Sequence, residues 1–261
     1  MLKEVRSKKQ HLFNKDDKLK VIEIFGESIL SAPDTERWKK RHRVLSAAFS
    51  RGNLEFMCKV AVKTTDQLIK TKWEILLQCS GAQQNVQYWS DTLDEFIVER
   101  KKKIEKGEEI SQQDLLSLMV KANIENNDLT TDHVKSNALL LFLAGTETSS
   151  NTLQWVIYEL AKRPEIQKRA HQEVDEVLQN GKLDPSFQLY DSFVFCNAII
   201  HETLRCHPPV GSLSKRCIKN TQLGKFEIPK GTAIHPLITQ ANKNDQVWEL
   251  HHTFHPDRFG G

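Results

Sequence analysis

The chain has 261 residues, of which 39% are hydrophobic and 27% are charged, and its formal net charge is +3. This is the composition of an ordinary globular protein, with enough apolar residues for one large domain or two small ones. The near balance of 37 basic and 34 acidic residues, with no aromatic residues interleaved in a basic stripe, excludes a typical nucleic-acid-binding surface.

The sequence also argues against two further classes. Its longest strongly apolar run, near 138–144, is far shorter than the ~20 residues that span a bilayer. The basic N-terminus has no apolar segment behind it, so we expect no signal peptide or anchor in this chain. The cysteines show no Cys-x-x-Cys spacing, which argues against a zinc site and favours buried reduced thiols. They are Cys58, Cys79, Cys196, Cys206 and Cys217.

The first half of the chain is predicted to be a series of helices. Ser31-Ala32-Pro33-Asp34 opens the first, over about 34–50, and Gly107 ends the third. Ser111 is expected to cap the fourth. The second and third are expected over about 54–77 and 86–106. The apolar residues that the first helix turns toward a core are Trp38, Val44, Leu45 and Phe49.

A longer helix is predicted from Thr130 to about Lys162, because this range has no proline and Gly145 is its only glycine. At a rise of about 1.5 Å per residue it would be about 50 Å long. The stretch 138–144 is apolar on every side, and a helix that is apolar all round is normally buried on every face. We therefore expect this helix to run through the middle of the fold.

Two more helices are expected after the long one. Pro164 is placed to start the first of them and Gly181 to end it. The second covers about 192–206, and Pro208-Pro209 stops it.

The last part of the chain is not predicted to be helical. Short strands are expected at 226–228 and 233–235, around the turn Pro229-Lys230-Gly231-Thr232. The end, from Asn242 to Gly261, is expected to be irregular. The fold class is therefore mainly α with a minor β part.

The first candidate site is Ala144-Gly145-Thr146-Glu147-Thr148-Ser149, in the middle of the long helix. Glycine costs about 1 kcal/mol in a helix interior, and a buried unpaired carboxylate at Glu147 would cost more. Gly145 followed by threonine can also loosen the helix and hold water. The alternative is that the helix simply reaches the surface here.

Two further segments carry paired charges. The spacing of Glu202 and Arg205 places them on one helix face, a common and weak pairing when it is exposed to solvent. The segment 254–259 contains Arg258, which could reach Glu202 and complete a carboxylate held by two guanidinium groups. Its alternative is an ordinary surface loop.

These segments, in this order, resemble the oxygen-binding helix, the Glu-x-x-Arg helix and the Pro-Glu-Arg-Phe loop of the cytochrome P-450 family. Pro229-Lys230-Gly231-Thr232 is similar to that family's Pro-x-Gly-Thr, and the helix 36–50 to its tryptophan-containing helix. The resemblance is close over about 129–259 and patchy over 38–49. It implies an incomplete cytochrome P-450-like fold, with a helical N-terminal part at 1–128 and the family core at 129–261, in one partial domain.

The resemblance also implies roles for particular residues. Ala144 and Gly145 would leave room for dioxygen, and Glu147 and Thr148 would relay protons to it. Glu202, Arg205 and Arg258 would form a structural lock behind a haem b. The residues expected to contact the haem are Trp38, His42, Arg43 and Arg216. The stretch 212–214 would lie near the substrate.

Four departures from the family pattern qualify this assignment. No cysteine stands in the context of the family's haem-binding loop, so no metal ligand is assigned. The segment between Trp38 and Gly145 is shorter than in the family, which implies a missing internal stretch. His42 replaces an arginine, with Arg41 and Arg43 beside it. The N-terminal anchor and first sheet are also missing.

Two functions remain open. In the first, the chain is a fragment, inactive alone, of a monooxygenase that inserts one oxygen atom of O2 into a small hydrophobic organic substrate. Its electrons would come ultimately from NADPH through a reductase, which the basic helix 39–43 could face unless it is an ordinary solvated surface. The family's usual location is the endoplasmic reticulum membrane, reached through the missing anchor. In the second, the chain is a non-catalytic helical remnant or interaction module without haem.

Overall fold

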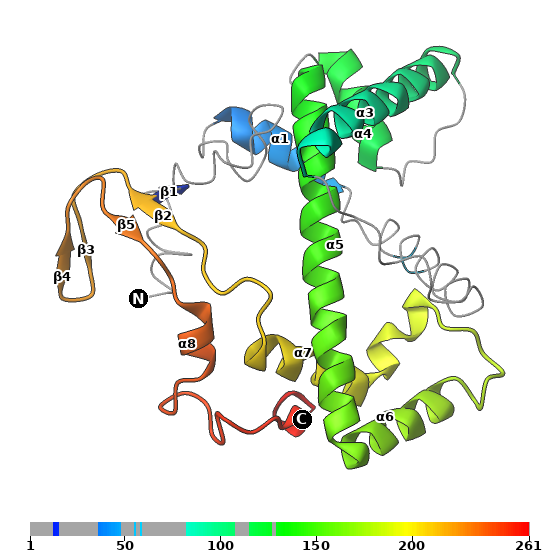
Figure 1. Cartoon of the computed structure of the whole chain (residues 1–261), viewed down its shortest axis with the longest axis vertical. Helices are drawn as coiled ribbons and strands as arrows, with labels where there is room; N and C mark the ends of the chain where they lie inside the picture. Colours follow the sequence, from blue (N-terminus) through cyan, green and yellow to red (C-terminus); the bar gives the residue numbers. More distant parts are fainter. Residues whose placement is uncertain are drawn as a thin grey trace. The chain divides into compact units, whose positions relative to one another are not determined.

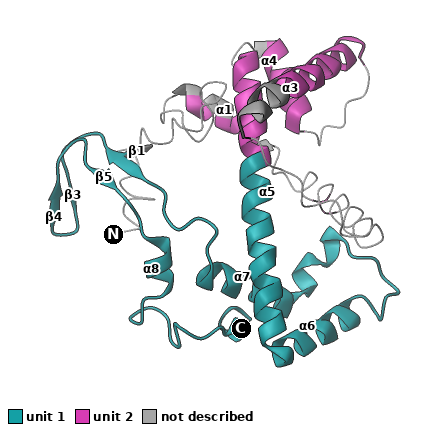
Figure 2. Cartoon of the chain, viewed as in Figure 1, with its two compact units in different colours: residues 1–10, 143–261 teal, residues 11–142 magenta. Residues whose placement is uncertain are grey.

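The computed structural model describes residues 13–15, 36–47, 55, 58, 82–107, 115–126 and 129–260. The chain divides into two compact units, one of residues 11–142 and one of residues 143–261 with the first ten residues (Figure 2). Each unit is described by itself. The described part is mostly helical with a small amount of sheet, which confirms the expected fold class (Figure 1). No helix within it carries an apolar stretch long enough to cross a bilayer.

The unit of residues 11–142 is built from helices around one apolar core. Its elements are the strand β1 (Phe13–Lys15) and the helices α1 (Glu36–Ala47), α3 (Ala82–Glu105), α4 (Leu115–Asn126) and the first part of α5 (Thr131–Lys162). Leu45 of α1, Ile97 of α3 and Val120 of α4 are buried together with Val134 of α5.

The predicted helices of this unit agree with the structure where the chain is described. α3 stops at Glu105, and Gly107 follows with a φ of +67°, a conformation that glycine adopts without strain. The expected helix at 54–77 and the expected cap at Ser111 lie outside the described residues, apart from Glu55 and Cys58. The expected opening at 31–34 also lies outside them.

The long helix α5 matches its predicted range, but its predicted burial was wrong. Leu139 and Leu140 are buried, whereas Phe142 and Leu143 are 52% and 47% exposed. The helix is packed toward its ends: Val134 belongs to the core described above, and Leu160 packs against a second core. An all-round apolar sequence shows what a helix is able to bury, but it does not supply the neighbours that would cover it.

The unit of residues 143–261 is a group of helices followed by short strands. Its helices are α6 (Pro164–Val177), α7 (Val194–Cys206) and α8 (Ile238–Asn242), with single 3-10 turns η5 (Phe187–Ser192) and η6 (Pro256–Phe259). α6 and α7 lie near the C-terminal end of α5 (Figure 1). Ile166 and Ala170 of α6 pack with Ile199 of α7 and with Phe254, which precedes η6.

The boundaries of α6 and α7 are close to those predicted. Pro164 occupies the first turn of α6, as expected. The helix ends at Val177, however, so the expected end at Gly181 was placed too late. Gln179 and Asn180 already adopt positive φ angles of 52° and 55°, and Gly181 only continues this turn at 80°. Asparagine is among the residues that tolerate this conformation best after glycine, so the chain leaves the helix earlier.

The expected strands on either side of the turn at 229–232 are present, and each pairs with an earlier strand. β4 (Phe226–Ile228) pairs with β3 (Thr221–Leu223), and β5 (Ala233–Ile234) pairs with β2 (Lys215–Cys217), both antiparallel. The tight connection of β3 to β4 contains Gly224 at a φ of +61°, which suits a short hairpin turn. The turn at 229–232 therefore joins strands of two different sheets.

Candidate functional site

Glu202 of α7 is a fully buried carboxylate, with 0% of its surface exposed. Arg205, three residues later on the same helix face, donates from Nε to Oε2 at 2.7 Å and from Nη2 to Oε1 at 2.8 Å. This is the fork-to-fork geometry that makes an arginine–carboxylate pair strong and directional. A charge that is withdrawn from water is stable only when it is paired in this way.

A second arginine approaches the same carboxylate from the end of the chain. Arg258 of η6 places its Nε 3.2 Å from Oε1 and 3.1 Å from Oε2 of Glu202. The backbone N–H of His255 donates to Oε1 at 2.8 Å. The structure therefore brings Glu202, Arg205 and Arg258 together, and we call these three residues the Glu202 assembly.

Arg205 also connects α7 to the loop that leads to η6. Its Nη1 donates to the carbonyl oxygens of Asn242 and His251, both at 2.9 Å, and its Nη2 donates to that of Thr253 at 3.1 Å. With the bonds to Glu202, every N–H direction of the guanidinium group is used. The hydrogen bonds to Glu202 raise the pKa of Arg205 above its ordinary value, although burial opposes this. Arg205 is therefore a permanent cation that orders a long irregular segment.

Arg258 orders the same loop from its other side. Its Nη1 donates to the carbonyl oxygen of Glu249 at 2.7 Å and its Nη2 to that of Leu250 at 3.3 Å. The ring of Trp248 lies 5.6 Å from the guanidinium carbon of Arg205 and 5.9 Å from that of Arg258. Both cations are thus within the range at which an aromatic face contributes to their binding.

The second candidate site, on α5, is more open than the sequence suggested. Glu147 is exposed, which agrees with the alternative that the helix reaches the surface here, since no described neighbour covers this face of the helix. Thr148 donates its hydroxyl proton to the carbonyl oxygen of Ala144 at 2.6 Å, one helical turn back. A Cβ atom built at Gly145 would meet nothing within 4 Å. We call the four residues 144, 145, 147 and 148 the α5 motif; Gly145 and Glu147 are exposed, and Ala144 and Thr148 are half-buried.

The helix remains regular through this motif. Thr152 repeats the same bond, from its hydroxyl to the carbonyl oxygen of Thr148 at 2.8 Å. Such bonds satisfy the threonine hydroxyls within the helix and are known to bend helices slightly. The whole range Thr131–Lys162 is assigned as α-helix, so the structure contains no break at Gly145.

The remaining expected cofactor-binding residues belong to two different elements, β2 and α1. Arg216 of β2 donates from Nη1 to the carbonyl oxygen of Gly231 at 2.9 Å. Trp38, His42 and Arg43 belong to α1, in the other unit, where the rings of Trp38 and His42 are 4.8 Å apart. His42 and Arg43 are exposed.

A cysteine that binds iron must be a thiolate. Burial, reinforced by the carboxylate of Glu173, raises the pKa of Cys196 to about 12. Burial also raises the pKa of Cys206. Cys217 is buried, and its Sγ contacts the carbonyl oxygen of Lys219 at 2.9 Å. The raised pKa values of Cys196 and Cys206 and the carbonyl contact of Cys217 do not fit a haem ligand.

Several functional contacts were not found from the sequence. Glu159 of α5 is buried and binds both Arg163 and His207. Arg169 of α6 binds Asp257. The spacing of Glu159 and Arg163, four residues apart on a helix, was the available signal. The contacts to His207 and Asp257 join distant parts of the chain and leave no trace in a single sequence.

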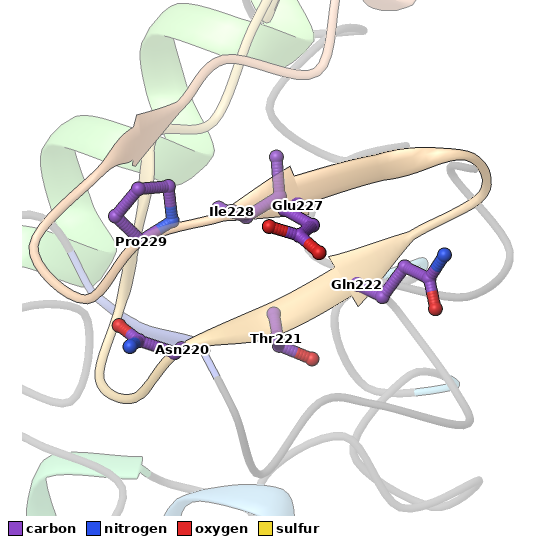
Figure 3. A pocket seen from close by; sticks show the side chains of 6 residues that line it. All are labelled: Asn220, Thr221, Gln222, Glu227, Ile228 and Pro229. Carbon is purple, nitrogen blue, oxygen red and sulfur yellow. The ribbon is translucent and has the colours of Figure 1, made fainter.

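A hollow of about 380 Å³ lies at the β3–β4 hairpin, away from these residues (Figure 3). The described residues that line it are Asn220, Thr221, Gln222, Glu227, Ile228 and Pro229. Asn220 uses its side-chain oxygen to accept the N–H of Lys230 at 2.8 Å, which shapes the turn. The hollow shares no residue with the Glu202 assembly or with the α5 motif.

Comparison with known proteins gives a consistent result. The family model "Cytochrome P450" matches residues 75–260. Cytochrome P450 71D181 of Origanum vulgare is 29% identical over 74% of this chain, and cytochrome P450 3A28 of Bos taurus is 27% identical over 67% of it. Secologanin synthase 1 of Catharanthus roseus is 31% identical over 63%. The chain spans 39%, 36% and 33% of the lengths of these three relatives.

Solved structures show the same fold. A zebra fish cytochrome P450 crystallised with progesterone superposes with a TM-score of 0.82, at 19% identity, over 99% of this chain and 76% of its own. The zebra fish structure with abiraterone gives 0.77 at 21% identity, over 98% and 74%. At this level of identity the likeness concerns the fold.

Proposed function

The chain belongs to the cytochrome P450 family, and from this premise we propose that it is part of a haem-dependent monooxygenase. The complete enzyme would insert one oxygen atom of O2 into a small hydrophobic organic substrate. The observation that carries the proposal is the Glu202 assembly: a carboxylate with no exposed surface, held by Arg205 and Arg258 from two distant segments. A chance surface pair would not be desolvated in this way.

Within that enzyme we assign roles to the α5 motif. Glu147 and Thr148 are the side chains that carry protons, and Ala144 and Gly145 leave space beside them. The open surroundings of Gly145 and the hydroxyl of Thr148, already oriented by Ala144, support this assignment. Arg216, Trp38, His42 and Arg43 are proposed to bind the cofactor. The three residues of the Glu202 assembly are structural.

Haem supplies the oxygen chemistry in this family when its iron is held by a cysteine thiolate. Three of the described thiols, Cys196, Cys206 and Cys217, do not fit this ligand. Because none of the five cysteines stands in the sequence context of the family's haem-binding loop, we propose that the 261 residues alone are inactive and that the ligand comes from outside them. The length of the relatives, of which this chain spans 39% or less in the examples above, supports a fragment. We propose that its electrons come from NADPH through a reductase and that the complete enzyme is located at the endoplasmic reticulum membrane.

The test compares the 261-residue chain with the product of the full transcript, sequenced beyond the codon for Gly261. Both are purified after expression with added haem precursor, reduced and exposed to carbon monoxide. We expect the longer product to show the red-shifted Soret band of a thiolate-ligated haem and the shorter chain to lack it. The band in the shorter chain would overturn the fragment proposal. Its absence from both would overturn the monooxygenase proposal.

The exposed middle of α5 favours one alternative, a non-catalytic interaction module without haem. A module must be stable by itself, whereas a fragment of an enzyme need not be. A cooperative thermal transition of the haem-free 261-residue chain, together with a transcript that stops at Gly261, would support the module.

A further inference from the structure

Glu159 is a second buried carboxylate, and the proposed function gives it no role. It lies on α5 and is 5% exposed. Arg163, one turn later, binds Oε2, and the imidazole Nε2 of His207 lies 2.7 Å from Oε1. The two oxygens thus have different partners, one from the end of α5 and one from the residue after α7. A carboxylate at this depth requires both, since a buried acceptor without a partner is costly.

The imidazole of His207 is held on α5 by more than its hydrogen bond. Its ring stacks on the indole of Trp155, with centroids 3.8 Å apart and planes inclined by 2°. Trp155 lies one helical turn before Glu159, so both contacts come from the same face of α5. The backbone N–H of His207 donates to the carbonyl oxygen of Thr203 at 2.7 Å and ends α7. The ring therefore fixes the C-terminal end of α7 against α5.

Arg163 makes the corresponding contact to the loop before η6. Its guanidinium carbon lies 4.9 Å from the ring centroid of Phe254, which is buried. The next residue, His255, donates its backbone N–H to Glu202 at 2.8 Å. On the other side, His207 follows Arg205 by two residues. Arg163 thus contacts the segment whose His255 N–H binds Glu202, and His207 directly follows the helix that carries Glu202 and Arg205.

We propose that Glu159, with His207 and Arg163, positions the Glu202 assembly by holding the end of α7 and the loop before η6 on α5. They are positioning residues, because they contact no residue of the α5 motif. The benefit of this positioning for catalysis rests on the proposed function. The structural connection between Glu159 and the Glu202 assembly does not. Loss of the His207 contact should leave Oε1 of Glu159 without its partner and let both segments shift.

The experiment measures native-state hydrogen exchange of individual amides in the 261-residue chain by NMR. The key amide is that of His255. It donates a hydrogen bond to Glu202 and makes no hydrogen bond to His207. His207→Phe keeps an aromatic ring for Trp155 but removes the donor, and we expect the His255 amide to exchange roughly tenfold faster. His207→Gln keeps an N–H donor and should restore most of the protection. His171→Phe, at an exposed position on α6, is the matched control and should change nothing.

The outcomes separate a positioning role from a local one. If His207→Phe accelerates exchange only at the end of α7, near Thr203 and His207, and leaves His255 protected, the proposal is wrong. Should circular dichroism show that His207→Phe does not fold, Glu159→Gln gives the same test in a milder form. Unchanged His255 exchange in a folded Glu159→Gln chain would equally overturn the proposal. Haem binding enters none of these measurements, so failure of the monooxygenase proposal would leave the result standing.

Discussion

Arg169 holds the carboxylate of Asp257 with both terminal nitrogens, from Nη2 to Oδ1 at 2.7 Å and from Nη1 to Oδ2 at 3.1 Å. Its guanidinium carbon also lies 3.9 Å from the ring centroid of Phe195. Asp257 immediately precedes Arg258, so this contact ties η6 to α6 beside the Glu202 assembly.

The pair predicts a pH dependence of stability. Hydrogen bonding by Arg169 holds the pKa of Asp257 below its ordinary value. A carboxyl whose pKa is lowered by folding stabilises the fold above its unfolded pKa of about 3.9 and loses that contribution as the pH falls through the folded value. Because the side chains are 51% and 45% exposed, the pair should contribute less than about 1 kcal/mol.

The measurement is urea unfolding of the parent chain and of Arg169→Gln at pH 7 and in acid. The difference in free energy of unfolding should be present at pH 7 and should shrink as the pH falls below about 4. Lys168→Gln, at the exposed neighbouring position, controls for the loss of one positive charge from α6. A difference between parent and Arg169→Gln that grows in acid would contradict this account.

The two arginines of the Glu202 assembly should differ in their tolerance of lysine. Lysine keeps the charge but has three donors at one point, whereas the bonds of Arg205 run to Glu202, Asn242, His251 and Thr253. We expect Arg205→Lys to cost about 3 kcal/mol of unfolding free energy, as for a broken buried pair. Arg258→Lys should cost clearly less, since its side chain is 11% exposed against 2% for Arg205.

Chemical denaturation of both variants under identical conditions checks this order. The comparison controls itself, because the substitution, the net charge and the carboxylate partner are the same. Equal losses would contradict the expected order, since Arg258 has two carbonyl partners, Glu249 and Leu250, where Arg205 has three.

The sequence predicted those parts of the molecule in which local pattern decides the structure. Thr130 to Lys162 has no helix breaker, and α5 forms there; Glu202 and Arg205 pair because they are three residues apart on a helix. Arg258 could be offered only as a possible partner of Glu202, with a surface loop as the alternative, because nothing local connects residues so far apart in the chain; the family resemblance favoured the pairing. The burial on every face expected of 138–144 failed as a prediction because burial depends on neighbours.

The partners of the strands could not be predicted from the sequence for a related reason. A turn such as 229–232 indicates that the chain reverses, but it does not say which strand becomes the partner. β4 pairs with β3 across the short turn that contains Gly224, and β5 pairs with β2. The same limit hid His207, whose contacts to Trp155 and Glu159 are made across the fold.

Glu173 of α6 caps the first turn of α7, and this predicts a stability effect. Its Oε1 accepts the N–H of Phe195 at 2.6 Å and its Oε2 that of Cys196 at 2.7 Å. A carboxylate here satisfies two free helix N–H groups and favours the positive end of the helix dipole. Glu173→Gln keeps one oxygen and should lower the unfolding free energy by about 1 kcal/mol. Glu176→Gln, exposed on the same helix, should change it little.

Cys196 is predicted to resist alkylation in the folded chain. Its pKa rises from 9.0 to about 12, chiefly through burial and further through Glu173. At pH 8 the thiolate fraction should therefore fall by about a thousandfold, while the greater nucleophilicity of a more basic thiolate recovers roughly thirtyfold. We expect iodoacetamide to label Cys196 about thirtyfold more slowly in the native chain than in urea.

Mass spectrometry of the labelled peptides measures this ratio, and Glu173→Gln tests its cause. Removing the carboxylate takes away a smaller part of the pKa rise, so labelling of Cys196 should become faster but should not reach the rate in urea. The reference is the labelling of the same peptide in the Glu176→Gln chain, which should match that of the parent. If Glu173→Gln restores the full urea rate, the carboxylate rather than burial keeps Cys196 protonated, or the cap holds the turn that covers it. Exchange of the Asn197 amide, which donates to the carbonyl oxygen of Phe193 at 3.0 Å and not to Glu173, decides between these in that variant, since only an opened turn accelerates it.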